Sequence, residues 1–201
     1  MTNKAKEKFW LLKIKQVAKN EGWKFKGNFI FKAVDELYFS SHFYVNGKTN
    51  ELSGWLDYKT INIDNVFWDI IDEQPNKKMP FSFRGEAAFC VRPINYFHFN
   101  VVINDLFNPE PQVEQLLQKI NFKVTEKSKA IRTIDDFRSD MLREEKSNTV
   151  GIVTSFIAQG QFKQALSKVK EYRANQFPSG FRFGKNEFYD LATEYCKKNY
   201  R

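Results

Sequence analysis

The sequence predicts an α+β fold: an N-terminal helix, an antiparallel β-meander and further strands with a packed helix, followed by a C-terminal helical bundle portion. Three observations predict it. Apolar residues recur at helical spacing near the N-terminus, alternate with polar residues between residues 25 and 58, and return to helical spacing beyond residue 110. We therefore expect an α+β domain at 1–105 and a helical portion at 110–201, packed on the first as one compact unit.

Residues 3–22 have the spacing of an amphipathic helix that directs one apolar face at a core and has Gly22 as its stop signal. The apolar face consists of Trp10, Leu11, Ile14, Val17 and Ala18. A stripe of lysines runs beside this face and consists of Lys4, Lys8, Lys15 and Lys19. We interpret the stripe as a solvated edge whose methylene groups cover apolar surface; a row of phosphate-binding cations is the alternative.

Three strands are predicted next, at 25–33, 37–45 and 52–58, because apolar and polar side chains alternate along each of them. The dipeptide Asn46-Gly47 supports a hairpin between the second and third strands, since both residues readily take positive φ angles. The period of two indicates an antiparallel meander with one face on a core.

Between residues 62 and 103 the pattern predicts a helix at 62–73, a loop at 74–80 and two strands near 81–91 and 94–103. Four pairs of phenylalanines are separated by a single residue, at 29/31, 81/83, 97/99 and 181/183. Because residues two apart share one face of a strand, we interpret the pairs as core residues; exposed platforms on which bases stack are the alternative.

Helical patterns follow at 111–121, 133–146, 148–159, 161–175 and 186–199. Thr133 is a candidate N-cap, because two carboxylates follow it in the first helical turn. Gly160 makes a short connection, which predicts an antiparallel pair of helices.

The net charge of +8 is unevenly distributed. Residues 1–32 carry nine lysines against two acidic residues, a net charge of +7. Residues 33–122 carry seven basic and twelve acidic side chains, a net −5, and residues 123–201 carry sixteen and ten, a net +6. This pattern suits a protein partner at least as well as nucleic acid, for which one basic face is typical.

The sequence lacks the familiar catalytic motifs: it has no glycine-rich phosphate loop, no Gly-x-Ser-x-Gly and no cysteine or histidine set with metal-ligand spacing. We therefore expect no catalysis, no cofactor and no metal. The candidate binding residues are the four lysines of the first helix together with His42, Tyr44 and Trp55 on the aromatic-lined meander. For His42 and His98, a hydrogen-bonded structural role is the simpler interpretation.

One enzymatic alternative remains. The order helix, three strands, helix, strand resembles the core of restriction-endonuclease-like nucleases, which hold Mg²⁺ with an Asp on the second strand and an acidic-x-Lys motif on the third. Asp57 and Lys59 would supply that motif, and Asp35 or Glu36 the other carboxylate. The acidic-x-Lys spacing occurs twice in the chain, no more often than chance predicts, so we rank a nuclease below a binding protein.

The residues after the first helix resemble the opening of a family of small bacterial α+β domains of unknown function, in which Gly-aromatic-Lys-x-Lys-Gly-x-x-Phe leads into a strand meander. The resemblance covers about residues 5–60 and is carried by Gly22, Trp23, Lys24, Lys26, Gly27 and Phe31. It implies a small bacterial protein without known activity, similar in type to the non-catalytic partners found beside bacterial toxins.

The function we expect is that of a non-catalytic bacterial protein-binding protein, with a toxin-neutralising immunity protein as its specific form, because a steric plug requires no chemistry. Nucleic-acid binding and a Mg²⁺-dependent nuclease are the alternatives. No apolar run approaches the roughly 18–20 residues that span a bilayer, and the first residues do not resemble a secretory signal. Two cysteines also fit a reducing compartment, so we expect a cytoplasmic location without membrane contact.

Overall fold

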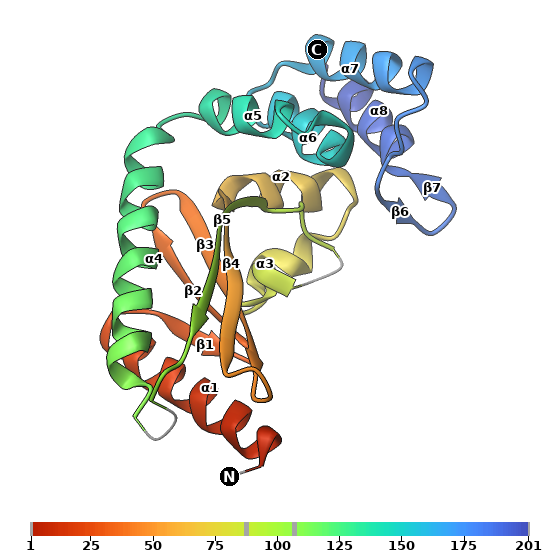
Figure 1. The fold of residues 1–201 in the computed structure, drawn as a ribbon. Helices are drawn as coiled ribbons and strands as arrows, with labels where there is room; N and C mark the ends of the chain where they lie inside the picture. Colours follow the sequence, from red (N-terminus) through yellow and green to blue (C-terminus); the bar gives the residue numbers. More distant parts are fainter. Residues whose placement is uncertain (1, 87–88, 106–107, 201) are drawn as a thin grey trace. The chain divides into compact units, whose positions relative to one another are not determined.

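The computed structural model describes residues 2–86, 89–105 and 108–200 and has the predicted α+β fold (Figure 1). The chain forms two compact units. The first consists of Met1–Tyr58 and Asn95–Ala130, and the second of Lys59–Ile94 and Ile131–Arg201. None of the helices in the described ranges is long and apolar enough to cross a membrane.

The first unit is built on an antiparallel sheet in which the strands follow one another in chain order. The strands are β1 (Lys24–Lys26), β2 (Phe29–Val34), β3 (Leu37–Asn46), β4 (Glu51–Thr60) and β5 (Ile94–Val102). The last two residues of β4 and the first of β5 group with the second unit. Strands β1 and β5 are therefore the two edges of the sheet.

The single strand predicted at 25–33 is wrong, because the chain folds back there into a hairpin. Strand β1 pairs with β2 so that Lys24 lies opposite Phe31 and Lys26 opposite Phe29. Gly27 has a φ of +60°, which a residue without a Cβ adopts at little cost. The alternation of apolar and polar residues continues through the turn, and it therefore concealed the reversal of the chain.

Helices α1 (Asn3–Asn20) and α4 (Glu110–Ala130) pack against each other, and α1 also packs against β1 and β3 (Figure 1). The predicted apolar face of the first helix is confirmed, since Trp10, Ile14, Val17 and Ala18 are buried and Leu11 is half-buried. Helix α4 buries an aliphatic stripe that consists of Val113, Leu116, Leu117, Ile120 and Val124.

Both helices lie on one face of the sheet. Lys32 donates a hydrogen bond to the Asn121 side chain of α4 over 2.6 Å, and Lys32 is paired in register with Phe39. The face that carries Lys32 and Phe39 is therefore the face that the helices cover. Phe29 and His42 are paired three positions away, an odd number, and therefore project from the other face.

The second unit consists mainly of helices. They are α2 (Ile61–Ile70), the 3-10 helix η1 (Gln74–Lys78), α3 (Phe83–Glu86), α5 (Ile134–Leu142), the 3-10 helix η2 (Glu145–Ser147), α6 (Thr149–Ala158), α7 (Phe162–Ala174) and α8 (Phe188–Asn199). A short hairpin of β6 (Arg182–Phe183) and β7 (Asn186–Glu187) precedes α8. Helix α6 packs against α2, α5, α7 and α8.

Local signals at two helix ends have the predicted effect. Thr133 caps α5, where its hydroxyl accepts from the Asp136 amide at 3.2 Å and the Asp136 carboxylate accepts from the Thr133 amide at 2.9 Å. Such a reciprocal capping box satisfies two of the amides that a helix start leaves free. Gly160, at a φ of +69°, joins α6 to α7, which pack together.

The strand predicted near 81–91 is not a strand in its described parts, and residues 87 and 88 lie outside the described residues. The chain forms the single turn of α3 there instead. Arg84 donates to the Ile61 carbonyl at 2.9 Å and to the Asn65 side chain at 2.8 Å. These hydrogen bonds with α2 are long-range contacts that the spacing of Phe81 and Phe83 does not report.

The two units do not follow the division at residues 105–110 that we expected from the sequence. Helix α4 belongs to the first unit, although it was assigned to the helical portion, and it runs to Ala130 rather than to residue 121. Conversely, the segment Lys59–Ile94 joins the helices of the second unit. Whether the units pack as one body remains a prediction.

Gly54 is required by the close approach of two chain segments inside the first unit. A Cβ at this position would overlap the His42 carbonyl oxygen and lie 2.6 Å from the Phe99 ring. We expect Gly54→Ala to destabilise the chain by about 1–3 kcal/mol, since an overpacked site forces its neighbours to shift. Urea unfolding measures this loss, with Ser53→Ala on the same strand as the control variant. Equal unfolding midpoints for the two variants would contradict the prediction.

Candidate functional site

Four aromatic side chains form a continuous row on the sheet face opposite α1 and α4. The imidazole of His42 stacks on Phe29 and on Trp55, with 5.2 Å between ring centroids in each case. Tyr44 stacks on the other side of Trp55 at 5.3 Å. Three candidate binding residues from the sequence, His42, Tyr44 and Trp55, are therefore brought together.

The carboxylate of Asp57 lies next to two rings of this row, those of Trp55 and His42. Its Oδ2 accepts a hydrogen bond from the indole Nε1 of Trp55 at 2.7 Å and lies 3.9 Å from Nε2 of His42. The side chains of His42 and Asp57 are 12% and 9% exposed, whereas Tyr44 is 50% exposed. The row is thus packed at its inner end and accessible at Tyr44.

The lysine stripe lies elsewhere. Its four members are exposed on α1, which packs on the opposite face of the sheet from His42. Lys15 lies over the Phe25 ring at 5.7 Å. The neighbouring Lys6 and Lys13 are held by Asn50 and Glu110, at 3.2 and 2.9 Å. The structure therefore does not bring the stripe and the aromatic row together.

The residues of the nuclease alternative are engaged in different contacts. Asp35 is exposed in the β2–β3 turn with a φ of 51°, and Asp57 belongs to the aromatic row. Lys59 is fully buried and donates to Asp64 and to the Val91 carbonyl, each at 3.0 Å. In the described ranges, no group of three or more His, Cys, Asp and Glu residues could hold a metal ion.

Lys59 and Asp64 form the centre of a buried ionic network in the second unit. Both side chains are 0% exposed, their charged atoms approach to 2.8 Å, and Arg84 lies 3.4 Å from the same carboxylate. The Val91 amide donates to Asp64 at 2.9 Å. The carboxylate thereby ties β4, α2 and α3 to the chain that enters β5, because each partner satisfies a group that has lost its water.

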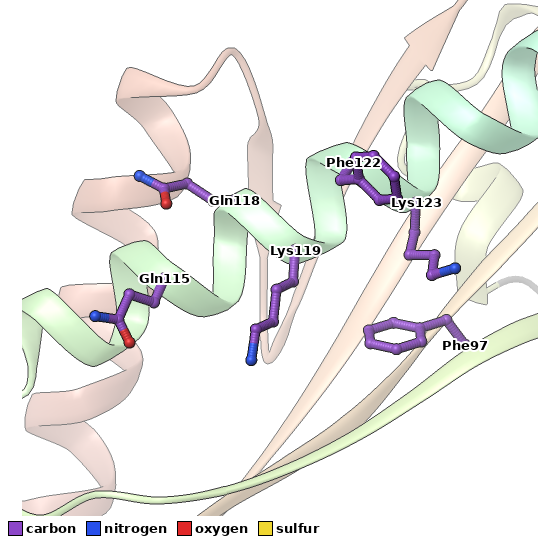
Figure 2. Close-up of a pocket in the computed structure, with 6 residues that line it drawn as sticks. All are labelled: Phe97, Gln115, Gln118, Lys119, Phe122 and Lys123. Carbon is purple, nitrogen blue, oxygen red and sulfur yellow. The ribbon is translucent and has the colours of Figure 1, made fainter.

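An open groove lies between β5 and α4 in the first unit (Figure 2). Its volume is about 470 Å³ and its lining is formed by Phe97 of β5 and by Gln115, Gln118, Lys119, Phe122 and Lys123 of α4. The Phe122 ring is 67% exposed. In Figure 2 the side chains of Lys119 and Lys123 extend from α4 towards the side on which Phe97 lies.

Charge around the groove is distributed unequally. Lys123 pairs with Glu126 at 2.8 Å, and the Tyr96 hydroxyl donates to the other oxygen of that carboxylate at 2.8 Å. The hydrogen bond from Lys123 and, to a smaller extent, the one from Tyr96 lower the pKa of Glu126. Lys119 has no partner in the part of the chain that the structure describes. It therefore leaves an uncompensated positive charge at the groove.

The groove was not predicted, because the helix expected at 111–121 ends before Phe122 and Lys123, whereas α4 continues to Ala130. A signal was nevertheless present. At 100° per residue, Phe122 lies about 200° from both Ile120 and Val124, so its ring projects opposite the buried stripe. A single exposed ring is common on protein surfaces, so Phe122 indicates a binding surface only together with its neighbour Phe97 in the folded chain.

The buried network makes a specific prediction for stability. Asp64→Ala leaves Lys59 buried without its counter-ion, and we expect a loss of about 3–5 kcal/mol in the free energy of unfolding. Asp69→Ala on the same helix removes the more exposed pair with Lys77 and serves as the control, for which we expect less than about 1 kcal/mol. Denaturant unfolding measures both, and a similar loss in the two variants would show that the network adds nothing.

The two cysteines predict how stability depends on pH. Burial raises the pKa of the Cys90 thiol to about 12 and that of Cys196 to about 11. Between pH 9 and those values the unfolded chain loses thiol protons that the folded chain keeps, so stability falls as the pH rises. In the double variant Cys90→Ser, Cys196→Ala, we expect the free energy of unfolding to decrease less between pH 9 and 10 than it does in the parent. Urea unfolding at several pH values measures this decrease, and an equal decrease in parent and variant would contradict the prediction.

Comparison with models of known protein families found none that matches the chain, and comparison with curated proteins and with solved structures found no significant match. The resemblance of residues 5–60 to small bacterial α+β domains therefore stays a prediction.

Proposed function

We propose that this chain is a protein-binding protein that acts by covering a surface of its partner and not by catalysis. The observation that carries the proposal is the groove beside the exposed ring of Phe122. Isolated apolar residues are common on protein surfaces, but Phe122 lies together with Phe97 along one open groove. Buried aromatic anchors supply much of the affinity in protein interfaces.

The charged residues around the groove support the same function. Lysines flank the rings, so an incoming surface would meet an apolar centre within a polar and basic rim. Lys59, by contrast, is fully buried in its contacts with Asp64 and Val91, and this burial favours a structural role over a catalytic one.

A toxin-neutralising immunity protein is the specific form of this proposal. It rests on the resemblance of the N-terminal residues to partners of bacterial toxins, together with the polarised charge of the chain. A protein of this kind has to block a site and needs only a stable scaffold with a complementary surface. A cytoplasmic location belongs to the same proposal.

Nucleic-acid binding is the second candidate, and the exposed lysines of α1 are the observation that favours it. Lys4, Lys8, Lys15 and Lys19 all lie at the surface, and the sequence pI is about 9.3. Their charges would act through counter-ion release from phosphates, an effect that depends on salt and not on sequence.

The proposed function is tested by affinity capture from the native host with the tagged full chain. We expect a stoichiometric partner, and we expect Phe122→Gln to lower the affinity for it at least about tenfold, because an aromatic hot spot contributes about 2 kcal/mol or more. The stability of this variant should stay within about 0.5 kcal/mol of the parent, since the ring is exposed. Leu142→Gln, which alters an exposed apolar residue of the second unit, is the control.

Two results would contradict the proposed function. One is the absence of any stoichiometric partner, and the other is a partner whose recovery is the same for Phe122→Gln as for the parent.

The second candidate predicts measurable affinity for a DNA duplex or a single strand at about 50 mM salt, falling steeply as salt rises. Replacing the four stripe lysines by glutamine should then reduce the slope of log affinity against log salt by about 3, since each lost phosphate contact accounts for about 0.7–0.9. Fluorescence anisotropy with labelled oligonucleotides measures this slope, and no binding at low salt removes the candidate.

A further inference from the structure

The two edges of the sheet differ in how they meet solvent. Strand β1 has three residues, two of which are exposed lysines, and such short, charged edges resist pairing with other chains. Strand β5 has nine residues, contains no lysine, arginine, proline or acidic side chain, and exposes Val102 at 54%. A long uncharged edge of this kind is a template for an additional strand.

The hydrogen-bonding groups of β5 point outward at alternate residues. The Ile103 amide donates to the Asn50 carbonyl at 2.8 Å, so this residue faces the interior of the sheet. Its neighbours face the outer edge, where the Gln112 side chain donates to the Val102 carbonyl and accepts from the Asn104 amide, each at 2.9 Å. Gln112 thus bonds to this edge through one amide group, as a residue of an added strand would.

The same alternation directs the backbone groups of His98 and Asn100 to the outer edge. Both residues are exposed, and no hydrogen bond engages their backbone amides on that side in the part of the chain that the structure describes. These two outward-facing positions therefore precede the part of the edge that Gln112 occupies.

The groove runs beside this edge. Phe97 of β5 lines it (Figure 2). The ring of Phe97 lies 6.2 Å from that of Phe99 on the helix-covered face. Phe122 and Lys119 face it from α4. Alternate side chains of a strand added to β5 would project on the same face as Phe97, towards α4.

We propose that β5 takes up an extended segment of a partner protein as an additional strand, and that the alternate side chains of this segment, apolar and acidic, occupy the groove. This inference deepens the proposed function and rests on it. Backbone hydrogen bonds to the β5 edge supply affinity, and the groove supplies selection among side chains.

Charge decides which occupant fits. Lys119 has no partner among the described residues, and a carboxylate of the segment would complement it, whereas a second copy of this chain would bring another +8 charge. Single-stranded nucleic acid could stack on Phe122, but it offers no regular backbone donors and acceptors for the edge. The unused edge therefore favours a polypeptide.

The test uses the full chain and a fluorescein-labelled peptide, Thr-Glu-Thr-Leu-Thr-Glu-Thr, whose two glutamates and leucine share one face of a strand. We expect saturable binding by fluorescence anisotropy, weakened at least about tenfold when the glutamates are replaced by lysines. Asn100→Pro removes an outward amide at an edge that tolerates proline, and it should weaken binding about tenfold. Asn100→Ala keeps the amide and should bind within about twofold of the parent.

A peptide that is N-methylated at alternate residues keeps its side chains and loses its donors, so it tests the strand even if Asn100→Pro fails to fold. Equal binding of the methylated peptide would overturn the inference. Two further results would overturn it. One is that a thymidine 15-mer binds more tightly than the peptide and that Asn100→Pro does not change this binding. The other is that the chain sediments as a dimer and that Asn100→Pro dissociates this dimer. Partner capture that is lost in Phe122→Gln and kept in Asn100→Pro would overturn strand addition and leave the proposed function intact.

Discussion

Helix α4 buries its aliphatic stripe and packs against α1, and this packing fixes what the first unit presents to solvent. Once the stripe is buried, the helical period of 3.6 residues leaves Phe122 on the outer side of α4. The same packing sets the start of α4 beside the end of β5, where Gln112 bonds to Val102 and Asn104. The groove is therefore a consequence of helix register, and a shift of α4 by one residue would rotate its exposed ring away.

The two faces of the sheet have different chemical roles. The helix-covered face supplies aliphatic and aromatic core residues and, at its β5 margin, the groove that Lys119 lines. The opposite face carries the stacked row that ends in the accessible ring of Tyr44. Unlike the aromatic row, the groove lies next to outward-facing backbone groups of β5 that no hydrogen bond engages within the described residues. For this reason the proposed strand addition involves β5 and not the aromatic row.

Local patterns predicted most elements, and they were wrong where a contact distant in sequence decided the structure. The apolar face of α1, the strands β3 and β4 and the cap at Thr133 each follow from residues a few positions apart. The hairpin at Gly27 preserved the alternation, so the reversal was not visible. The segment at 81–91 has phenylalanines at strand spacing, but Arg84 is held by α2, and no local pattern reports that contact.

The sequence by itself determined the α+β class, the identity of most core residues and the polarised charge, because periodicity and composition depend only on neighbouring residues. Tertiary structure decided which candidates share a surface. It joined His42, Trp55 and Asp57 through strand register, placed the lysines of α1 on the other face, and paired Lys59 with Asp64. It also brought Phe122 beside the open edge of β5, since pairing and packing between distant segments are set by the whole core.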